Sequence, residues 1–192
     1  MSKHCHFIIH KPFGYLSQFI YTATVRKNKK LLGELYNFPE GTMAIGRLDQ
    51  DSEGLIFLTT DGKESQAVRS SKVEKEYYAQ LDGLISDEAL HKLQNGIEIT
   101  IETGKYLTKP CKIEVLNPQP IFPERSKRIR DDRHGPTQWV SITLSEGKNR
   151  QVRKMTAASG FPTLRLIRIR IGNMLLDNLN SGDVLEVEKF EY

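Results

Sequence analysis

Hydrophobic and polar positions divide the chain into short segments, most of which have the length and composition of strands. Apolar, β-favouring residues gather in runs that Gly, Pro, Asn or Ser interrupt. KPFG, which follows the first of these runs, is typical of a turn. The predicted strands are HFIIH (6–10), TMAIGRLD (42–49), GLIFLTT (54–60), EKEYYAQLDG (74–83), GIEITIE (96–102), YLTKPCKIEVL (106–116), QWVSITLSEG (138–147), LRLIRIRIG (164–172) and DVLEVEKF (183–190).

Helical patterns lie between these strands, and each has a start or stop signal. Asp61 followed by Glu64 suits a capping box, Ser86 is a good N-cap, and Asn95-Gly96 and Gly160 are typical C-terminal stops. The predicted helices are RKNKKLLGELYNF (26–38, ending near Pro39), GKESQAVRS (62–70), DEALHKLQNG (87–96) and KNRQVRKMTAASG (148–160). Strands in hairpin-like succession, mixed with helices, predict an α+β fold with a mixed, mostly antiparallel sheet.

The length of 192 residues, 38% of them hydrophobic, suits one globular domain over 1–192 with a substantial core. One segment, 117–137, interrupts the regular elements. It is rich in proline and in basic side chains, which predicts an exposed basic loop rather than a buried element. We expect this loop to wrap RNA and to be poorly ordered without it. Alternatively, Asp131 and Asp132 pair with the arginines of the loop.

The net charge of +4 is by itself a weak indication of a nucleic-acid partner. The distribution of the basic residues is more informative, because they cluster in the C-terminal half and predict a polyanion-binding surface there. The three groups are Arg125 to Arg133, Lys148 to Lys154, and Arg165 with Arg168 and Arg170.

Two cysteines, Cys5 and Cys111, are too few for a disulfide framework. No signal peptide or membrane span is evident, which predicts a cytoplasmic protein. His4-Cys5-His6 has metal-ligating side chains, but no second ligand pair follows at a finger-like spacing, and an exposed strand explains the pattern better. There is no phosphate-binding glycine motif and no Ser/His/Asp triad that spacing alone would assemble.

The stretch GRLDQDSEGLIFLTTDG (46–62) concentrates carboxylates around Gly54. Asp49, Asp51 and Glu53 match the first half of an EF-hand loop, but Thr60 stands where the bidentate Glu belongs and flanking helices are not predicted. A polar turn between strands is the simpler interpretation. EGKNRQVRKMTAASG likewise has two interpretations, as a phosphate site at a helix N-terminus or as a solvated basic helix face.

Four ordered motifs resemble those of pseudouridine synthases of the RsuA-like class. They are KPFGYLSQF, GRLDQDSEGLIFLTTDG, Lys75-Glu76-Tyr77 and EGKNRQVRKMTAASGFPTLRLIRIRIG. The resemblance covers nearly the whole chain. It implies the pseudouridine synthase fold, with helices flanking the sheet and a central cleft. The S4-type RNA-binding domain that many members carry first is not expected here, because KPFG ends at Gly14.

The resemblance also implies roles for individual residues. Asp49 corresponds to the nucleophile, Tyr77 to the tyrosine that stacks on the target base, and Arg153 to the basic residue that pairs with the aspartate. Arg47 is expected to fill the space that the flipped uridine leaves, and Leu166 to line the pocket. Asp51 and Glu53 are expected to be turn and cap residues. Further substrate contacts, mainly to phosphates, are expected from Lys148, Arg150, Lys154, Arg165 and Arg168.

The implied function is isomerisation of a specific uridine in large-subunit (23S) ribosomal RNA to pseudouridine. The reaction involves no redox step, so no cofactor or metal is expected. We expect a monomer that binds ribosomal RNA, without a membrane association or an obligate protein partner. The alternatives are a ribosome assembly factor that binds RNA without catalysis, and a synthase that acts on transfer RNA or on 16S ribosomal RNA.

Overall fold

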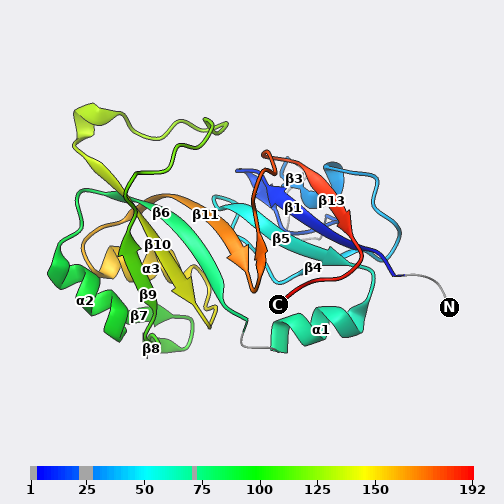
Figure 1. Ribbon diagram of the computed structural model, residues 1–192, viewed down its shortest axis with the longest axis horizontal. Helices are drawn as coiled ribbons and strands as arrows, with labels where there is room; N and C mark the ends of the chain where they lie inside the picture. Colours follow the sequence, from blue (N-terminus) through cyan, green and yellow to red (C-terminus); the bar gives the residue numbers. More distant parts are fainter. Residues whose placement is uncertain (1–3, 22–27, 71–72) are drawn as a thin grey trace. The chain divides into compact units, whose positions relative to one another are not determined.

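The computed structural model describes residues 4–21, 28–70 and 73–192 (Figure 1). The chain divides into two compact units. The first unit contains Met1–Val73 and Ile167–Tyr192, and the second contains Glu74–Leu166. Strand β11 (Thr163–Ile171) begins in the second unit and ends in the first.

The first unit is built around β5 (Glu53–Thr59), a strand whose residues are all buried. Its antiparallel neighbour β1 (His6–Lys11) pairs in turn with β13 (Val184–Val187). On its other side β5 pairs antiparallel with β4 (Met43–Ile45) and parallel with β11. Helix α1 (Gly62–Ser70) packs against β4 and β5. The remaining elements of this unit are β2 (Tyr15–Leu16), β3 (Lys30–Leu31), the 3-10 helix η1 (Leu32–Glu34) and β12 (Met174–Leu175).

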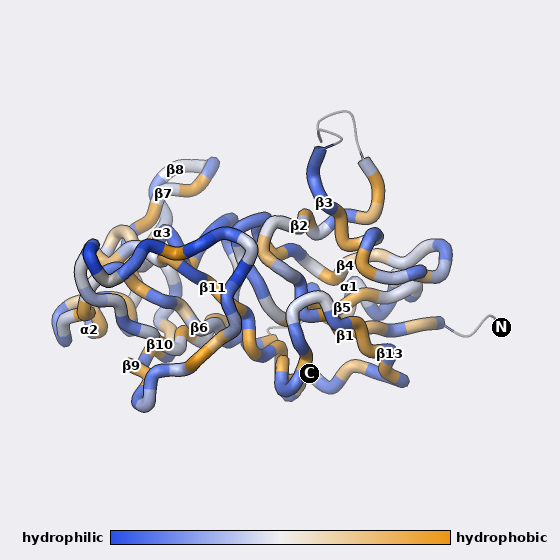
Figure 2. Tube along the Cα trace, turned by 90° about the horizontal axis from the view of Figure 1, so that it is seen from above, coloured by the Kyte–Doolittle hydropathy of each residue, from blue (hydrophilic) through white to orange (hydrophobic). Residues whose placement is uncertain are grey.

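In the second unit three antiparallel strands lie in the order β6 (Lys75–Asp82), β10 (Thr137–Leu144) and β9 (Lys112–Val115). Strand β10 pairs with β6 on one side and with β9 on the other. Helix α2 (Asp87–Asn95) packs against β9, and Figure 2 shows hydrophobic and hydrophilic colours along it, as an amphipathic helix requires. The other elements are the hairpin β7 (Glu98–Ile101) and β8 (Gly104–Leu107), the 3-10 helix η2 (Asp132–His134) and α3 (Gln151–Ala158).

Each unit has its own apolar core. In the first unit the ring of Phe57 stacks on that of Phe190, with centroids 4.4 Å apart, and Phe7 and Leu55 are buried beside β5. In the second unit a cluster of buried side chains joins the strands β6, β10 and β9 to α2 and α3, and includes Leu93, Ile142 and Met155. Buried apolar area of this kind is the main stabilising term for both units.

Most of the predicted elements are confirmed, and so is the mixed, mostly antiparallel sheet of an α+β fold. The prediction for α1 agrees at both ends. At its start Asp61 Oδ1 accepts a hydrogen bond from Lys63 N at 2.8 Å. The prediction for α2 differs only at the final glycine. The Ser86 side chain accepts from Ala89 N, and Gly96 adopts φ +97° just after the last helical residue.

Two predicted elements were wrong. Residues 26 and 27 of the helix predicted over 26–38 lie outside the described residues, and the rest of that range contains β3 and the single turn of η1. Leu32 N donates to Gln18 O at 3.0 Å, so this amide bonds to a residue distant in sequence and not to a carbonyl within a helix. The single strand predicted over 106–116 is two strands, β8 and β9, because Pro110 lacks the N–H that a continuous ladder needs. Within the described residues, no helix has the length and apolar character needed to span a membrane.

Candidate active site

The candidate active site starts from the turn that enters β5, named here the RLD turn (Gly46–Gly54). Gly54 adopts φ +106° and pairs with Arg168 across the parallel β5–β11 ladder. A Cβ at position 54 would overlap the main-chain atoms of Arg168. The glycine is therefore required twice, for its backbone conformation and for the close approach of β11.

Hydrogen bonds hold the residues on both sides of Asp49. Leu48 N donates to Ser17 Oγ at 3.0 Å, and Ser17 Oγ donates to Leu48 O at 2.9 Å. Gly14 N donates to Gln50 O at 2.8 Å, and Gln50 Nε2 donates to Gly14 O at 3.0 Å. Four short bonds thus connect the RLD turn to Gly14 of KPFG and to Ser17 just after it, and they fix the half-buried Asp49 between two anchored neighbours.

Behind the turn lies Lys11, a lysine with no exposed surface. Its Nζ donates to Pro12 O at 2.9 Å and to Tyr15 O at 2.8 Å. Burial lowers the pKa of Lys11 to about 7, and Arg168 acts in the same direction. Glu53, Asp51 and Asp49 oppose this shift. Burial thus disfavours the charged form of a lysine that sits among the carboxylates of the turn. KPFG was recognised as a motif in the sequence, but nothing in the pattern showed that its lysine is buried.

The carboxylates of the turn differ in their surroundings. Glu53 is only 2% exposed at the start of β5, whereas Asp49 and Asp51 are half-buried. Across the described ranges, no three His, Cys, Asp or Glu side chains are arranged to hold a metal ion. At the N-terminal strand His6 Nδ1 lies 3.0 Å from Thr59 Oγ1, an ordinary cross-strand hydrogen bond.

Arg47, on the same turn, has an exposed side chain. It borders a cavity of about 770 Å³ in the first unit, together with Phe19, Tyr36 and Phe38. The ring of Phe38 packs edge-to-face on those of Phe19 and Tyr36, with centroids 5.3 Å and 5.2 Å apart. An arginine next to an aromatic hollow has the composition of a nucleotide-contacting surface.

The second unit contains Tyr77 and Arg153. Tyr77, on β6, is half-buried, lies opposite Ile142 of β10 and packs against the core of this unit. Arg153, on α3, donates from Nη1 to Thr163 O at 3.1 Å, so it connects α3 to the start of β11. Leu166 is 4% exposed and belongs to the core cluster. Asp49 belongs to the other unit, so its meeting with Tyr77 and Arg153 around one substrate stays a prediction.

The loop that enters α3 is tightly organised around Glu146, a residue that sequence analysis did not single out. Glu146 accepts hydrogen bonds from Tyr106 Oη at 2.6 Å, Gln151 Nε2 at 2.6 Å and Lys109 N at 3.0 Å. Burial acts to raise the pKa of Glu146, but these three donors outweigh it and the pKa lies below its usual value. Gln151 Oε1 in turn accepts from Lys148 N at 2.8 Å.

Arg150 completes this loop with a left-handed backbone, φ 53° and ψ 34°, at the N-cap of α3. A non-glycine residue rarely adopts this conformation, and such strain is concentrated at functional sites. Lys148 and Arg150 are exposed at the helix entrance and Lys154 is half-buried. By contrast, Arg165 and Arg168 are 7% and 4% exposed, and donate to Pro123 O at 2.9 Å and Leu55 O at 2.7 Å.

Comparison with known proteins agrees with these motifs. A family model described as RNA pseudouridylate synthase matches residues 5–158. Ribosomal large subunit pseudouridine synthase E of Vibrio parahaemolyticus serotype O3:K6 is 41% identical over 183 residues, which is 94% of this chain and 73% of that protein. The protein of the same name from Xanthomonas axonopodis pv. citri is 38% identical over 90% of this chain and 88% of its own length.

A solved structure has the same fold. The crystal structure of a pseudouridylate synthase superimposes with a TM-score of 0.76 at 27% identity, covering 97% of this chain and 71% of that one. The sequence family, the curated relatives and the fold all agree. The chain is therefore an enzyme of the RNA pseudouridylate synthase family.

Proposed function

We propose that this enzyme isomerises one uridine of large-subunit (23S) ribosomal RNA to pseudouridine, with Asp49 as the catalytic carboxylate. Two relatives named for the large ribosomal subunit, at 41% and 38% identity, support the choice of RNA. The assignment of Asp49 depends on one observation, the hydrogen bonds that anchor Leu48 and Gln50 on either side of it. A catalytic carboxylate has to be held to a fraction of an ångström, and these bonds hold the backbone on both sides of Asp49.

The reaction exchanges one bond to the ribose for another. The bond between N1 of uracil and C1′ breaks, the base turns, and a bond between C5 and C1′ forms. C5 loses its proton and N1 gains one, so no electrons are exchanged with an outside partner. The carboxylate of Asp49 attacks C1′ or removes a neighbouring sugar proton, both of which are within the chemistry of an ionised aspartate.

The other residues hold the nucleoside and the RNA. Tyr77 stacks on the uracil and is placed to accept the C5 proton, and Arg153 pairs with Asp49. Arg47, which is exposed next to its aromatic hollow, fills the space of the extruded base. Lys148 and Arg150, exposed at the entrance of α3, bind backbone phosphates. The enzyme works as a cytoplasmic monomer without cofactor, metal or obligate protein partner.

Gene deletion with mapping of pseudouridines in total ribosomal RNA tests this proposal. We expect one large-subunit site to disappear in the deletion strain. Wild-type protein restores it, and so does the matched control Asp51→Asn, which removes a carboxylate from the same turn. Asp49→Asn does not restore it.

The same map distinguishes the alternatives. A lost site in 16S ribosomal RNA or in transfer RNA would replace the proposed substrate with that RNA. Restoration by Asp49→Asn would favour an assembly factor that binds RNA without chemistry. An anion at the centre of a pure phosphate-binding cleft weakens binding, which is why we favour the enzyme over that alternative.

A further inference from the structure

Residues 117–137 enclose a second hollow, which lies wholly in the second unit. In Figure 1 this segment is the long yellow-green excursion between β9 and β10. It surrounds a cavity of about 570 Å³, a volume in the range of small-ligand sites. Basic and aromatic side chains line it together, among them Phe122, Arg125, Lys127, Arg128 and Trp139.

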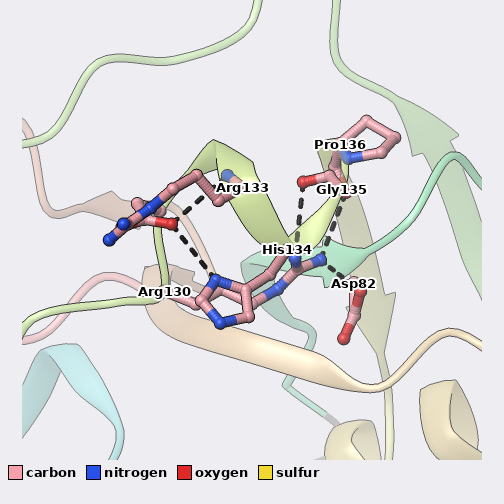
Figure 3. Close-up of polar contacts among 7 residues, drawn as sticks. Asp82, Arg130, Arg133, His134, Gly135 and Pro136 are labelled. Carbon is pink, nitrogen blue, oxygen red and sulfur yellow. Dashed lines mark hydrogen bonds and ion pairs between the residues drawn. The ribbon is translucent and has the colours of Figure 1, made fainter.

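Three arginines brace the walls of this cavity. Arg130 forms an ion pair with Asp82 of β6 and donates to Gly135 O and Pro136 O, each at 3.3 Å (Figure 3). Arg165 donates to Pro123 O at 2.9 Å, and Arg125 donates to Lys127 O at 2.8 Å and to Leu164 O of β11 at 3.4 Å. These contacts attach both ends of the segment to the sheet and give the cavity a defined shape.

The segment contains three acidic residues, Glu124, Asp131 and Asp132, of which Glu124 lines the cavity and Asp131 pairs within the segment. Asp131 pairs with Arg133 at 2.6 Å and with His134 at 3.1 Å. Burial acts against the lowered pKa of Asp131, but the hydrogen bonds from Arg133 and His134 prevail. The alternative that loop carboxylates pair with loop cations therefore holds for Arg133. Lys127 and Arg128 are exposed on the cavity wall.

The floor of the cavity is aromatic. The Phe122 ring lies 5.2 Å from that of Trp139, and the Arg165 guanidinium lies 5.5 Å from the Phe122 centroid. Trp139 is 8% exposed, so its ring is nearly buried and faces little besides this hollow and the core. Exposed cations beside aromatic rings are the combination that binds single-stranded nucleic acid, because phosphates and bases are contacted together.

We propose that this cavity binds an unpaired nucleotide of the RNA substrate, separate from the uridine that is isomerised. Lys127 and Arg128 bind its phosphate, and its base lies toward Phe122 and Trp139. This inference rests on the proposed function for the identity of the RNA. It adds a second contact, through which the enzyme holds the RNA at a distance from the reacting nucleoside.

Trp139 makes the test direct, because it is the only tryptophan of the chain. A fluorescently labelled, uridine-rich 12-nucleotide RNA is titrated into the full-length protein, and RNA anisotropy and tryptophan emission are followed together. We expect the Trp139 emission to change along the same binding curve as the anisotropy. Lys127→Gln/Arg128→Gln should weaken the RNA affinity obtained from either signal by about tenfold at low salt. It should also reduce the slope of log affinity against log salt concentration by about 1 to 2.

A matched control removes the same charge elsewhere. Lys63→Gln/Lys189→Gln replaces two exposed lysines of the first unit and should bind the RNA like wild type. Lys127→Glu/Arg128→Glu should weaken binding more than the glutamine pair does. All of these side chains are exposed, so folding is expected to be retained and is verified by thermal unfolding.

Either of two results would overturn the site. One is RNA binding seen by anisotropy with unchanged Trp139 emission. The other is equal affinity and salt slope for the 127/128 variant and the 63/189 control. Failure of the proposed function would be recognised separately, because wild type would then leave 23S ribosomal RNA unmodified whatever the binding curves show.

Discussion

The RLD turn (Gly46–Gly54) and the segment 117–137 both connect neighbouring strands, and they are held in opposite ways. The turn is fixed by bonds from main-chain atoms and short side chains, such as Ser17 to Leu48 and Gly14 to Gln50. The segment is fixed by long arginine side chains that reach carbonyl groups and Asp82.

This difference matches two kinds of task. A main-chain bond leaves little freedom, so Asp49 keeps the position that bond-making chemistry requires. A long arginine has many rotamers and can preserve its bonds while the backbone adjusts, which suits a surface that binds a flexible RNA. The turn therefore holds Asp49 in a fixed position, whereas the segment 117–137 can adjust its backbone to the RNA.

The largest expected effect comes from filling the space at Gly54. Gly54→Ala places a methyl group against the main chain of Arg168 and at a φ of +106°. We expect the free energy of unfolding to fall by about 3 kcal/mol or more, because neither backbone can move aside. Urea denaturation measures this change.

Gly62→Ala is the matched control, since nothing lies within 4 Å of the added methyl group in α1. It should stabilise the protein slightly, by about 0.4–1 kcal/mol. Equal effects of the two substitutions would show that the RLD turn is no more rigid than a helix terminus.

Lys11 gives the next largest effect, as a dependence of stability on pH. Its pKa is about 7 in the folded protein against an ordinary 10.5, so the unfolded chain binds more protons between these values. Stability from this group therefore rises with pH from about 7 to about 10, by at most about 1.4 kcal/mol per pH unit. Below pH 7 both states are protonated and the contribution is constant.

Lys11→Met should lose this rise, because the variant has no proton to exchange at that position. Unfolding free energies of both proteins at pH 7, 8, 9 and 10 give the comparison. Parallel curves for wild type and variant would mean that Lys11 is accessible to water in the folded protein.

The smallest expected effect concerns the segment. Arg130→Met removes the bonds to Asp82, Gly135 and Pro136, and should speed cleavage after Glu124 by a glutamate-specific protease about fivefold, the equivalent of about 1 kcal/mol. Arg133→Met is the control, because its ion pair with Asp131 is local and 86% exposed on the arginine side. Equal cleavage of the two variants would remove the role of Arg130 as a brace.

The sequence predicted those parts of the fold whose causes are local. Helices α1 and α2 could be bounded because Asp61, Ser86 and Gly96 act within a few residues of their own helix. The strands were found for the same reason, since alternation and turn residues are read along the chain. The RLD turn was identified as a motif, and its carboxylates as a cluster.

What the sequence did not predict depends on distant partners. Gly33, in the segment that was predicted to be a helix, lies close to Phe19, since a Cβ added at Gly33 would be only 3.2 Å from Phe19 O. No local sequence pattern reveals that contact. The burial of Lys11, the hydrogen bonds of Glu146 and the division between bracing and exposed cations in 117–137 also arise from tertiary packing. Composition shows that cations are present, but not which of them face solvent.

The most direct measurement follows the proton that leaves C5 of the target uridine. A 23S ribosomal RNA transcript tritiated at C5 of uridine is incubated with purified enzyme, and tritium released into water is counted. Wild type should release one equivalent per RNA, and Asp51→Asn should do the same. Asp49→Asn should be slower by at least about a thousandfold, as expected for loss of a covalent or proton-abstracting group. Release by Asp49→Asn at the wild-type rate would contradict the central claim that this carboxylate carries the reaction.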